Sequence, residues 1–248
     1  MKFYKSEKFQ KIFYPIVYLA FTIAITISGC YIFEHNYYTN IFVSGPSMNP
    51  TLVGVGEDEA QINIHHYGIA DTTEAAINSL KRFDVLITHY PETWHSDGLI
   101  VKRVWAFPGE TISLVSNDQS STFTVKDSED EIKYTITATK VNKEVDLIYS
   151  KVTMDLYEFN TGRKVFFTNA GTKRSLSNYT LGNNEYFVMG DNWSSSTDCY
   201  TKKDDSNRLT KNYLQGKVIC IQGYGKIATS GSEFQIYDKV KIRPMYNF

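Results

Sequence analysis

Ser47 lies in a short segment, V-S-G-P-S-M-N-P-T-L at residues 43–52, whose composition could hold one hydroxyl in a fixed place. Pro46 precedes the serine and Pro50 follows it. Each proline lacks a backbone N–H and restricts the residue before it, so the segment is predicted to be stiff and non-helical. A serine held in this way could act as a nucleophile in acyl transfer. The same residue types also build ordinary surface turns, so Ser47 alone leaves both interpretations open.

Lys102 is the candidate base for such a serine. The five histidines have neither triad nor metal-site spacing, and no metal site is predicted. In the strand-like run at 99–105, alternation places Lys102 on the face that carries Ile100 and Val104. Apolar surroundings disfavour an ammonium group and lower its pKa, which would leave a neutral amine able to take a proton. Arg103, on the opposite face, is expected to stay solvated. The alternative for Lys102 is a lysine that guards an edge strand against aggregation.

A third polar cluster follows the strand-like run at 186–189. Gly190-Asp191-Asn192 comes directly after this run, and Ser196 and Asp198 follow a few residues later. Their hydroxyl and carboxylate groups could position a neutral lysine. A plain turn is the alternative interpretation, because Gly, Asp, Asn and Ser are also common turn residues.

Residues 12–33 contain no charged side chain and are predicted to form a transmembrane helix. As a helix they would extend about 33 Å, enough to cross the hydrocarbon core of a bilayer. Four lysines lie within residues 1–11, which places the N-terminus in the cytoplasm and the rest of the chain outside the plasma membrane. A cleavable signal usually has a shorter apolar core. A lipidation box ending at Cys30 is the other alternative, but the residues after it remain apolar, which favours a continuing span.

The chain after the apolar run is predicted to be mostly β, because Tyr and Phe are abundant (18 and 15 of 248 residues). Residues 111–184 are polar and strand-patterned, which predicts a β-rich module inserted into a domain formed by residues 34–110 and 185–248. A net charge of −1 provides no field that would attract nucleic acid. Three cysteines are too few for a disulfide scaffold, although a Cys199–Cys220 bridge stays open.

Several spaced motifs after the apolar run resemble those of the type I signal peptidases, the membrane-bound leader peptidases that use a Ser–Lys dyad. The motifs are S-M-x-P-T at 47–51, K-R-V and P-G-E at 102–104 and 108–110, Y-F-x-M-G-D-N and S-x-D at 186–192 and 196–198, R-x-D-V at 82–85, and G-K-V at 216–218. Together they are far more specific than any one of them.

The resemblance implies a β-rich catalytic domain of the signal-peptidase type, in which Ser47 is the nucleophile and Lys102 the general base. Ser196 and Asp198 would orient the lysine, and Asp191 would hold the loop. No cofactor is required. The partners implied are exported preproteins at the membrane surface, membrane lipid and the general secretion translocon, with no nucleic acid.

The resemblance also bears on the oxyanion and on substrate contacts. The Ser47 N–H would be one oxyanion donor. Gly45 stands where the family often has a hydroxyl, as in many Gram-positive-like members, and Ser44 is the candidate second donor. The family cuts after small residues one and three positions before the cleaved bond. The residues expected to line these shallow pockets are Val43, Met48, Leu52, Ile100 and Val101.

The chain departs from the family pattern at several positions. Phe83 replaces a glycine, Trp193 replaces the arginine that usually follows G-D-N, and Cys199-Tyr200 replaces a Ser-Arg pair. These departures predict that Asp198 has lost an arginine brace. They also leave open a non-hydrolytic, membrane-anchored chaperone or assembly factor for particular surface proteins, such as pilus subunits. A self-cleaving Ser–Lys repressor is disfavoured, because the N-terminus offers a membrane span where a DNA-binding motif would be needed.

Overall fold

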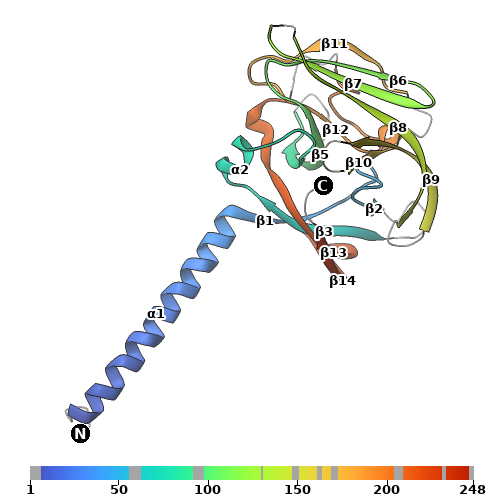
Figure 1. Ribbon diagram of the computed structural model, residues 1–248. Helices are drawn as coiled ribbons and strands as arrows, with labels where there is room; N and C mark the ends of the chain where they lie inside the picture. Colours follow the sequence, from blue (N-terminus) through green and yellow to red (C-terminus); the bar gives the residue numbers. More distant parts are fainter. Residues whose placement is uncertain are drawn as a thin grey trace. The chain divides into compact units, whose positions relative to one another are not determined.

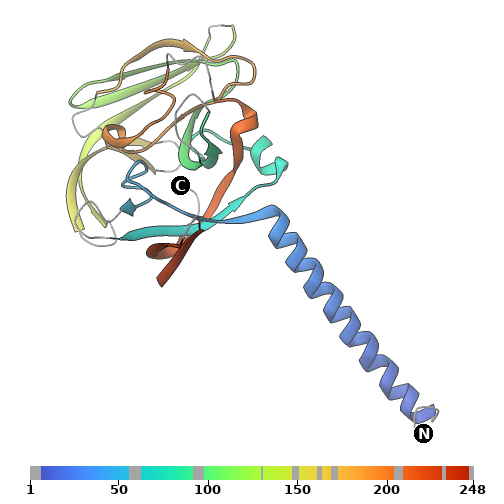
Figure 2. The same ribbon diagram turned by 180° about the vertical axis from the view of Figure 1, so that it is seen from behind.

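The structure is a computed structural model, seen from two opposite sides in Figures 1 and 2. The residues it describes are 7–55, 63–91, 98–129, 131–146, 151–160, 164–168, 173–203, 209–230 and 233–245. The chain divides into two compact units, Met1–Thr39 and Asn40–Phe248. The first consists mainly of one helix, and the second is a β domain.

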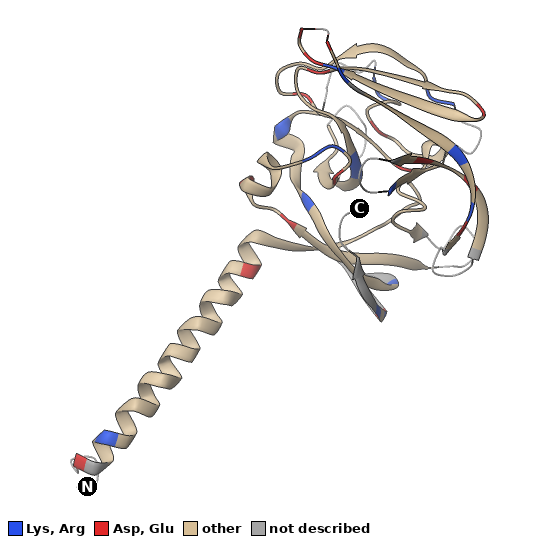
Figure 3. Cartoon of the chain, in the orientation of Figure 1, with Lys and Arg blue, Asp and Glu red and all other residues tan. Residues whose placement is uncertain are grey.

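Helix α1 spans Glu7–Tyr37 and extends beyond the predicted span at both ends. Its 31 residues correspond to about 46 Å at the helical rise per residue. Among the described residues it is the one helix that is long and apolar enough to cross a membrane, judged by length and composition alone. Figure 3 shows the middle of α1 free of charged residues among those described. Thr22 and Thr26 donate their hydroxyls to carbonyls four residues earlier (2.9 Å each), so these polar groups are satisfied within the helix.

The β domain contains two antiparallel sheets, which confirms the predicted mostly-β class (Figure 1). The first sheet has eight strands in the order β1-β3-β13-β4-β5-β12, with β14 paired to β13 and β2 paired to β3. Its strands are β1 (Tyr38–Phe42), β2 (Gly54–Val55), β3 (Ile64–Asp71), β4 (Val85–His89), β5 (Leu99–Ala106), β12 (Phe187–Met189), β13 (Leu214–Ser230) and β14 (Glu233–Met245). The short helix α2 (Glu74–Asn78) lies between β3 and β4, and the Thr73 hydroxyl caps its first turn.

The second sheet has six strands in the order β10-β9-β8-β7-β6-β11. They are β6 (Thr111–Ser116), β7 (Ser120–Lys126), β8 (Ile132–Asp146), β9 (Lys151–Asn160), β10 (Lys164–Phe167) and β11 (Leu176–Thr180). Along the chain all six lie between β5 and β12, which are paired neighbours in the first sheet. The chain therefore leaves the first sheet after β5, builds the second sheet, and returns beside β5.

An aromatic cluster centred on Trp105 of β5 joins the two sheets. Its ring lies 5.1 Å from that of Phe123 on β7 and 5.5 Å from that of Phe159 on β9, measured between centroids. Phe83, which replaces a family glycine, has the positive φ of 67° that glycine tolerates best. Its buried ring packs edge-on against Trp105 at 5.3 Å, which offsets the strain of that backbone geometry. The two sheets thus share one core, and β5 carries both this cluster and Lys102.

Candidate active site

Ser47 lies in a tight turn that follows β1, as the two prolines predict. Asn49 N donates to the Pro46 carbonyl (3.0 Å), and Leu52 N donates to the Met48 carbonyl (2.9 Å). Gly45 has φ 89°, in the left-handed region, and a Cβ there would meet no atom within 4 Å. Backbone conformation, and not lack of space, is therefore the structural reason for glycine at this position.

Two adjacent histidines of β3 anchor the segments on either side of this turn. His65 Nδ1 donates to the Val43 carbonyl (2.7 Å), and His66 Nδ1 accepts from Val53 N (2.8 Å). Burial lowers the pKa of His65, although its hydrogen bond to the Val43 carbonyl opposes this effect. The histidines are thus placed to hold the Ser47 turn on the first sheet, and sequence spacing did not indicate this role.

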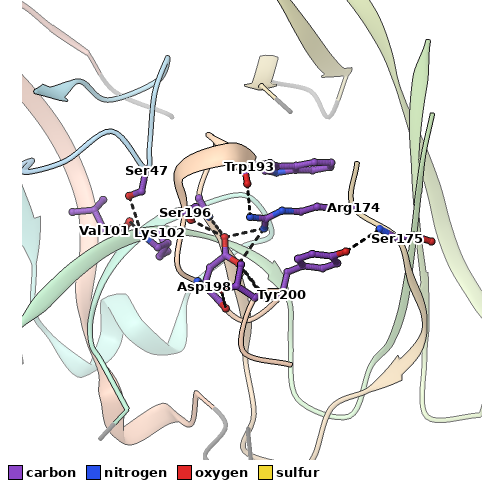
Figure 4. Close-up of polar contacts among 11 residues, drawn as sticks. Ser47, Val101, Lys102, Arg174, Ser175, Trp193, Ser196, Asp198 and Tyr200 are labelled. Atoms are coloured by element: carbon purple, nitrogen blue, oxygen red, sulfur yellow. Dashed lines mark hydrogen bonds and ion pairs between the residues drawn. The ribbon is translucent and has the colours of Figure 1, made fainter. Parts of the chain in front are cut away.

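Lys102 of β5 points at the Ser47 hydroxyl (Figure 4). Its Nζ lies 2.8 Å from Ser47 Oγ and 3.1 Å from the Val101 carbonyl oxygen. The Lys102 side chain is almost fully buried, and this burial lowers its pKa from 10.5 to about 8. The carboxylates of Asp198 and Asp191 act in the opposite direction and keep the pKa from falling further. Near neutral pH a useful fraction of the amine is therefore neutral and able to accept the serine proton.

Arg103, the neighbour of Lys102 on β5, is buried, and the prediction that it stays solvated is wrong. Its Nε donates to Asp191 Oδ1 (2.8 Å), and its Nη1 donates to the Phe83 carbonyl (2.7 Å). Thr51, at the end of the serine motif, also donates its hydroxyl to Asp191. Both faces of β5 are covered at this point, and the Asp191 carboxylate supplies the charge that a buried guanidinium requires. Asp191 thereby joins β5, the Ser47 turn and the loop after β12.

The loop after β12 lies directly against the Ser47 turn. Asn192 N donates to the Ser47 carbonyl (3.0 Å), and its side-chain amide donates to the Pro46 carbonyl (3.2 Å). A Cβ on Gly190 would overlap both the Ser47 carbonyl and the Ser196 hydroxyl. Glycine at 190 is therefore required by close approach of the loop to the turn.

Asp198 is the centre of the polar network in this loop. Its Oδ2 accepts from the Ser196 hydroxyl (2.7 Å) and from Gly190 N (3.1 Å). Its Oδ1 accepts from the backbone N of Tyr200 (3.1 Å) and of Thr201 (3.3 Å). In the described part of the chain, the Ser196 hydroxyl donates to Asp198, whereas the Lys102 amine contacts Ser47 and the Val101 carbonyl and not Ser196.

Arg174 provides the arginine that the sequence suggested was missing, and the prediction of a lost brace is wrong. Its Nη1 donates to both carboxylate oxygens of Asp198 (3.0 and 2.9 Å), and its Nη2 donates to the Trp193 carbonyl (3.0 Å). Arg174 lies in the connection between β10 and β11, outside every motif. No sequence signal singled it out, because the contact depends on how the second sheet packs against the first.

The five residues expected to line substrate pockets separate into two groups. Val43, Met48 and Leu52 belong to one buried apolar cluster of the first sheet, and the partly buried Val101 packs against it. Ile100 belongs to the larger cluster that joins the two sheets. Met48 and Leu52 have no exposed surface in this structure.

The backbone N–H of Ser47, the predicted oxyanion donor, has no backbone acceptor among the described residues. Ser44, the candidate second donor, is exposed beside the left-handed Gly45.

Cys199 and Cys220 are buried free thiols, and burial raises the pKa of Cys199 to about 12. Among the described residues no group of three or more His, Cys, Asp or Glu could hold a metal ion.

A serine within hydrogen-bonding distance of a buried lysine, on a β domain that follows a long apolar helix in the chain, is an arrangement in which a lysine could activate a serine nucleophile. The sequence model of the family described as signal peptidase, peptidase S26, matches residues 11–220. The match covers most of the chain, which therefore belongs to the S26 signal peptidase family. Comparison with proteins of curated function finds no match.

Proposed function

We propose that this protein is a membrane-anchored serine endopeptidase that removes signal peptides from exported preproteins, with Ser47 as nucleophile and Lys102 as general base. The observation that carries the proposal is the 2.8 Å separation between Oγ of the partly buried Ser47 and Nζ of the buried Lys102. Membership of the signal peptidase family supports preproteins as the substrate class.

The proposed reaction has an acylation and a deacylation step. Neutral Lys102 takes the Ser47 proton as Oγ attacks the scissile carbonyl carbon, and the Ser47 N–H stabilises the resulting oxyanion. The protonated lysine then gives its proton to the leaving amine, which departs as the new N-terminus of the mature protein. In deacylation Lys102 takes a proton from water, the hydroxide attacks the ester, and the proton returns to Ser47 Oγ.

The supporting residues have distinct proposed tasks. Asp198 and Ser196 maintain the loop behind Lys102, and Asp191 with Arg103 fixes that loop to β5. Ser44 is the proposed second oxyanion donor. Gly45 supports a Gram-positive-like subtype, in which glycine stands two residues before the nucleophile. Val43, Met48, Leu52, Ile100 and Val101 stay our proposal for the residues that select small side chains before the cleaved bond.

The proposed topology follows from charge and hydropathy. Residues 1–11 would stay in the cytoplasm, 12–33 would cross the plasma membrane, and the catalytic domain (34–110 and 185–248) would lie outside. Residues 111–184 would form an inserted module. The domain would then meet preproteins at the membrane surface, near lipid and the secretion translocon. The non-hydrolytic alternative depends on the departures within residues 193–208, and in the described part of this region Arg174 supplies Asp198 with an arginine contact.

A preprotein-processing assay with detergent-solubilised full-length protein tests the proposal. Ser47→Ala and Lys102→Ala should each abolish cleavage, and a serine-reactive probe should label the wild type but not Ser47→Ala. Ser194→Ala is the matched control, because that exposed hydroxyl binds only Asn192 Oδ1 among the described residues (2.8 Å). Retained cleavage in the Ser47 or Lys102 variant would exclude the dyad. A wild type that neither cleaves nor is labelled would favour the chaperone.

A further inference from the structure

Arg174 belongs to the second sheet in sequence, but its guanidinium lies in the polar network of the first. The connection from β10 to β11 carries it into contact with Asp198, and both side chains are fully buried. A buried charge that loses its partner is strongly destabilised, so each of the two groups depends on the other. The ion pair therefore makes the loop after β12 dependent on a residue that the second sheet supplies.

Two aromatic rings enclose the Arg174 guanidinium (Figure 4). Its Cζ lies 5.4 Å from the centroid of the Trp193 ring and 4.7 Å from that of the Tyr200 ring. Contacts of this kind stabilise a desolvated cation. Trp193 and Tyr200 stand at two positions where the family pattern has arginine. The departures at 193 and 200 are thus parts of one arrangement, in which residue 174 supplies the cation and two aromatic rings lie against it.

The chain that leaves β10 also holds the same loop through its backbone. Thr168 N donates to the Asp191 carbonyl, and Trp193 N donates to the Thr168 carbonyl (2.8 Å each). The ring of Phe167, the last residue of β10, stacks on Trp193 with centroids 4.1 Å apart. The loop is therefore held between the Ser47 turn on one side and the segment after β10 on the other.

We propose that Arg174 is a positioning residue for the Ser47–Lys102 pair and that the second sheet is thereby a structural part of the active site. The contacts form a continuous series. Arg174 holds Asp198, Asp198 accepts from Gly190 N and from Ser196, and Gly190 packs against the Ser47 carbonyl. This inference rests on the proposed function and goes beyond it, because it assigns a role to a residue outside the dyad and outside every family motif.

Arg174 also affects the protonation of the site. Its positive charge lowers the pKa of Lys102, whereas the Asp198 charge raises it. Without Arg174, Lys102 would lose a positive neighbour that lowers its pKa, so the amine would keep its proton to higher pH. The neutral form of Lys102, which the proposed reaction requires, would then be less populated at neutral pH. Loss of Arg174 should therefore shift the acid limb of the pH–rate profile upward.

The test measures kcat/KM for a preprotein-derived peptide against pH, with full-length protein in detergent. Arg174→Met removes the charge at similar length. We expect kcat/KM at pH 7 to fall at least tenfold and the acid limb of the profile to lie at higher pH than in the wild type. Arg174→Lys keeps the charge but loses the two-pronged contact, so the limb should stay in place while kcat falls. Lys173→Met is the matched control, because the neighbouring Lys173 forms an exposed ion pair with Asp118 (2.8 Å), and it should behave as wild type.

A relocation variant separates positioning from general stability. The Tyr200 ring lies beside the Arg174 guanidinium, and the Tyr200 backbone N donates to Asp198. The side chain of an arginine introduced at position 200 would therefore lie close to the Asp198 carboxylate. Arg174→Met combined with Tyr200→Arg should recover part of the lost activity and return the acid limb toward the wild-type pH. Thermal unfolding is measured for every variant.

Each outcome decides the proposal. An acid limb unchanged in folded Arg174→Met would overturn it, whatever happens to the rate. If Arg174→Met does not fold, the other two variants decide. A wild-type acid limb in the relocation variant, or a reduced kcat in Arg174→Lys, supports the proposal. If neither effect is observed, the proposal is overturned. A wild type that neither cleaves peptide nor labels at Ser47 refutes the proposed function as well. A wild type that cleaves while Arg174→Met keeps its acid limb refutes this proposal alone.

Discussion

Replacing Lys102 by methionine is expected to abolish activity and, at the same time, to stabilise the fold. Burial lowers the pKa of Lys102 from 10.5 to about 8, so the folded state binds this proton less tightly than the unfolded chain does. Between these two pKa values the unfolded state holds more protons, and stability therefore rises with pH across that window. Below about pH 8 the folded protein carries the full penalty of a buried ammonium, roughly 3 kcal/mol for a shift of about 2.5 pKa units.

Methionine has similar length and no charge, so at pH 7 Lys102→Met should recover most of this penalty. For a domain of this size the gain corresponds to an increase in Tm of roughly 6–12 °C. At pH 9.5 the buried lysine of the wild type is already neutral, and the gain should shrink to about 1 kcal/mol.

Differential scanning fluorimetry of full-length protein in detergent, at both pH values, measures this difference. Lys164→Met is the control, because that lysine is 72% exposed on β10 and should change stability by less than about 0.5 kcal/mol. A Lys102→Met protein no more stable than wild type at pH 7 would refute the reasoning. So would a gain of equal size at pH 9.5, since it could not come from an ammonium that burial penalises.

Three further predictions follow from the same site. The kcat/KM of the wild type should rise with pH and level off above about pH 8, with an increase of roughly 50-fold between pH 6 and pH 8; a profile already flat at pH 6 would exclude Lys102 as the titrating base. Asp191→Ala leaves Arg103 buried without its counter-charge and should lower the free energy of unfolding by about 3–5 kcal/mol, measured by chemical denaturation, whereas an effect below about 1 kcal/mol would contradict the buried pair. Gly190→Ala should abolish probe labelling of Ser47 while the protein still enters the membrane fraction, because the new Cβ overlaps the Ser47 carbonyl; normal labelling would show that the loop can move aside.

The features that the sequence predicts well are those set by near neighbours along the chain. The uncharged run at 12–33 is long enough to span a bilayer, so a helix there follows from composition, although the observed helix, Glu7–Tyr37, is longer at both ends. Two prolines around Ser47 exclude a helix without any tertiary contact. Alternation in β5 places Lys102 among apolar residues, because successive side chains of a strand point to opposite faces.

Tertiary structure alone decided which charges are buried and what compensates them. Alternation along β5 could not show that Arg103 is also buried. The carboxylate that compensates its charge belongs to Asp191, a residue 88 positions away in the chain. The brace of Asp198 comes from Arg174, on the connection between two strands of another sheet. The pKa of Lys102 near 8 likewise reflects desolvation by several elements at once, together with the charges of Asp198, Asp191 and Arg174. Short-range patterns therefore determine where Ser47 and Lys102 lie in the chain. Only packing of the two sheets determines how the pair is positioned and at what pH it can react, since electrostatic energies depend on distance and burial in space and not on separation in sequence.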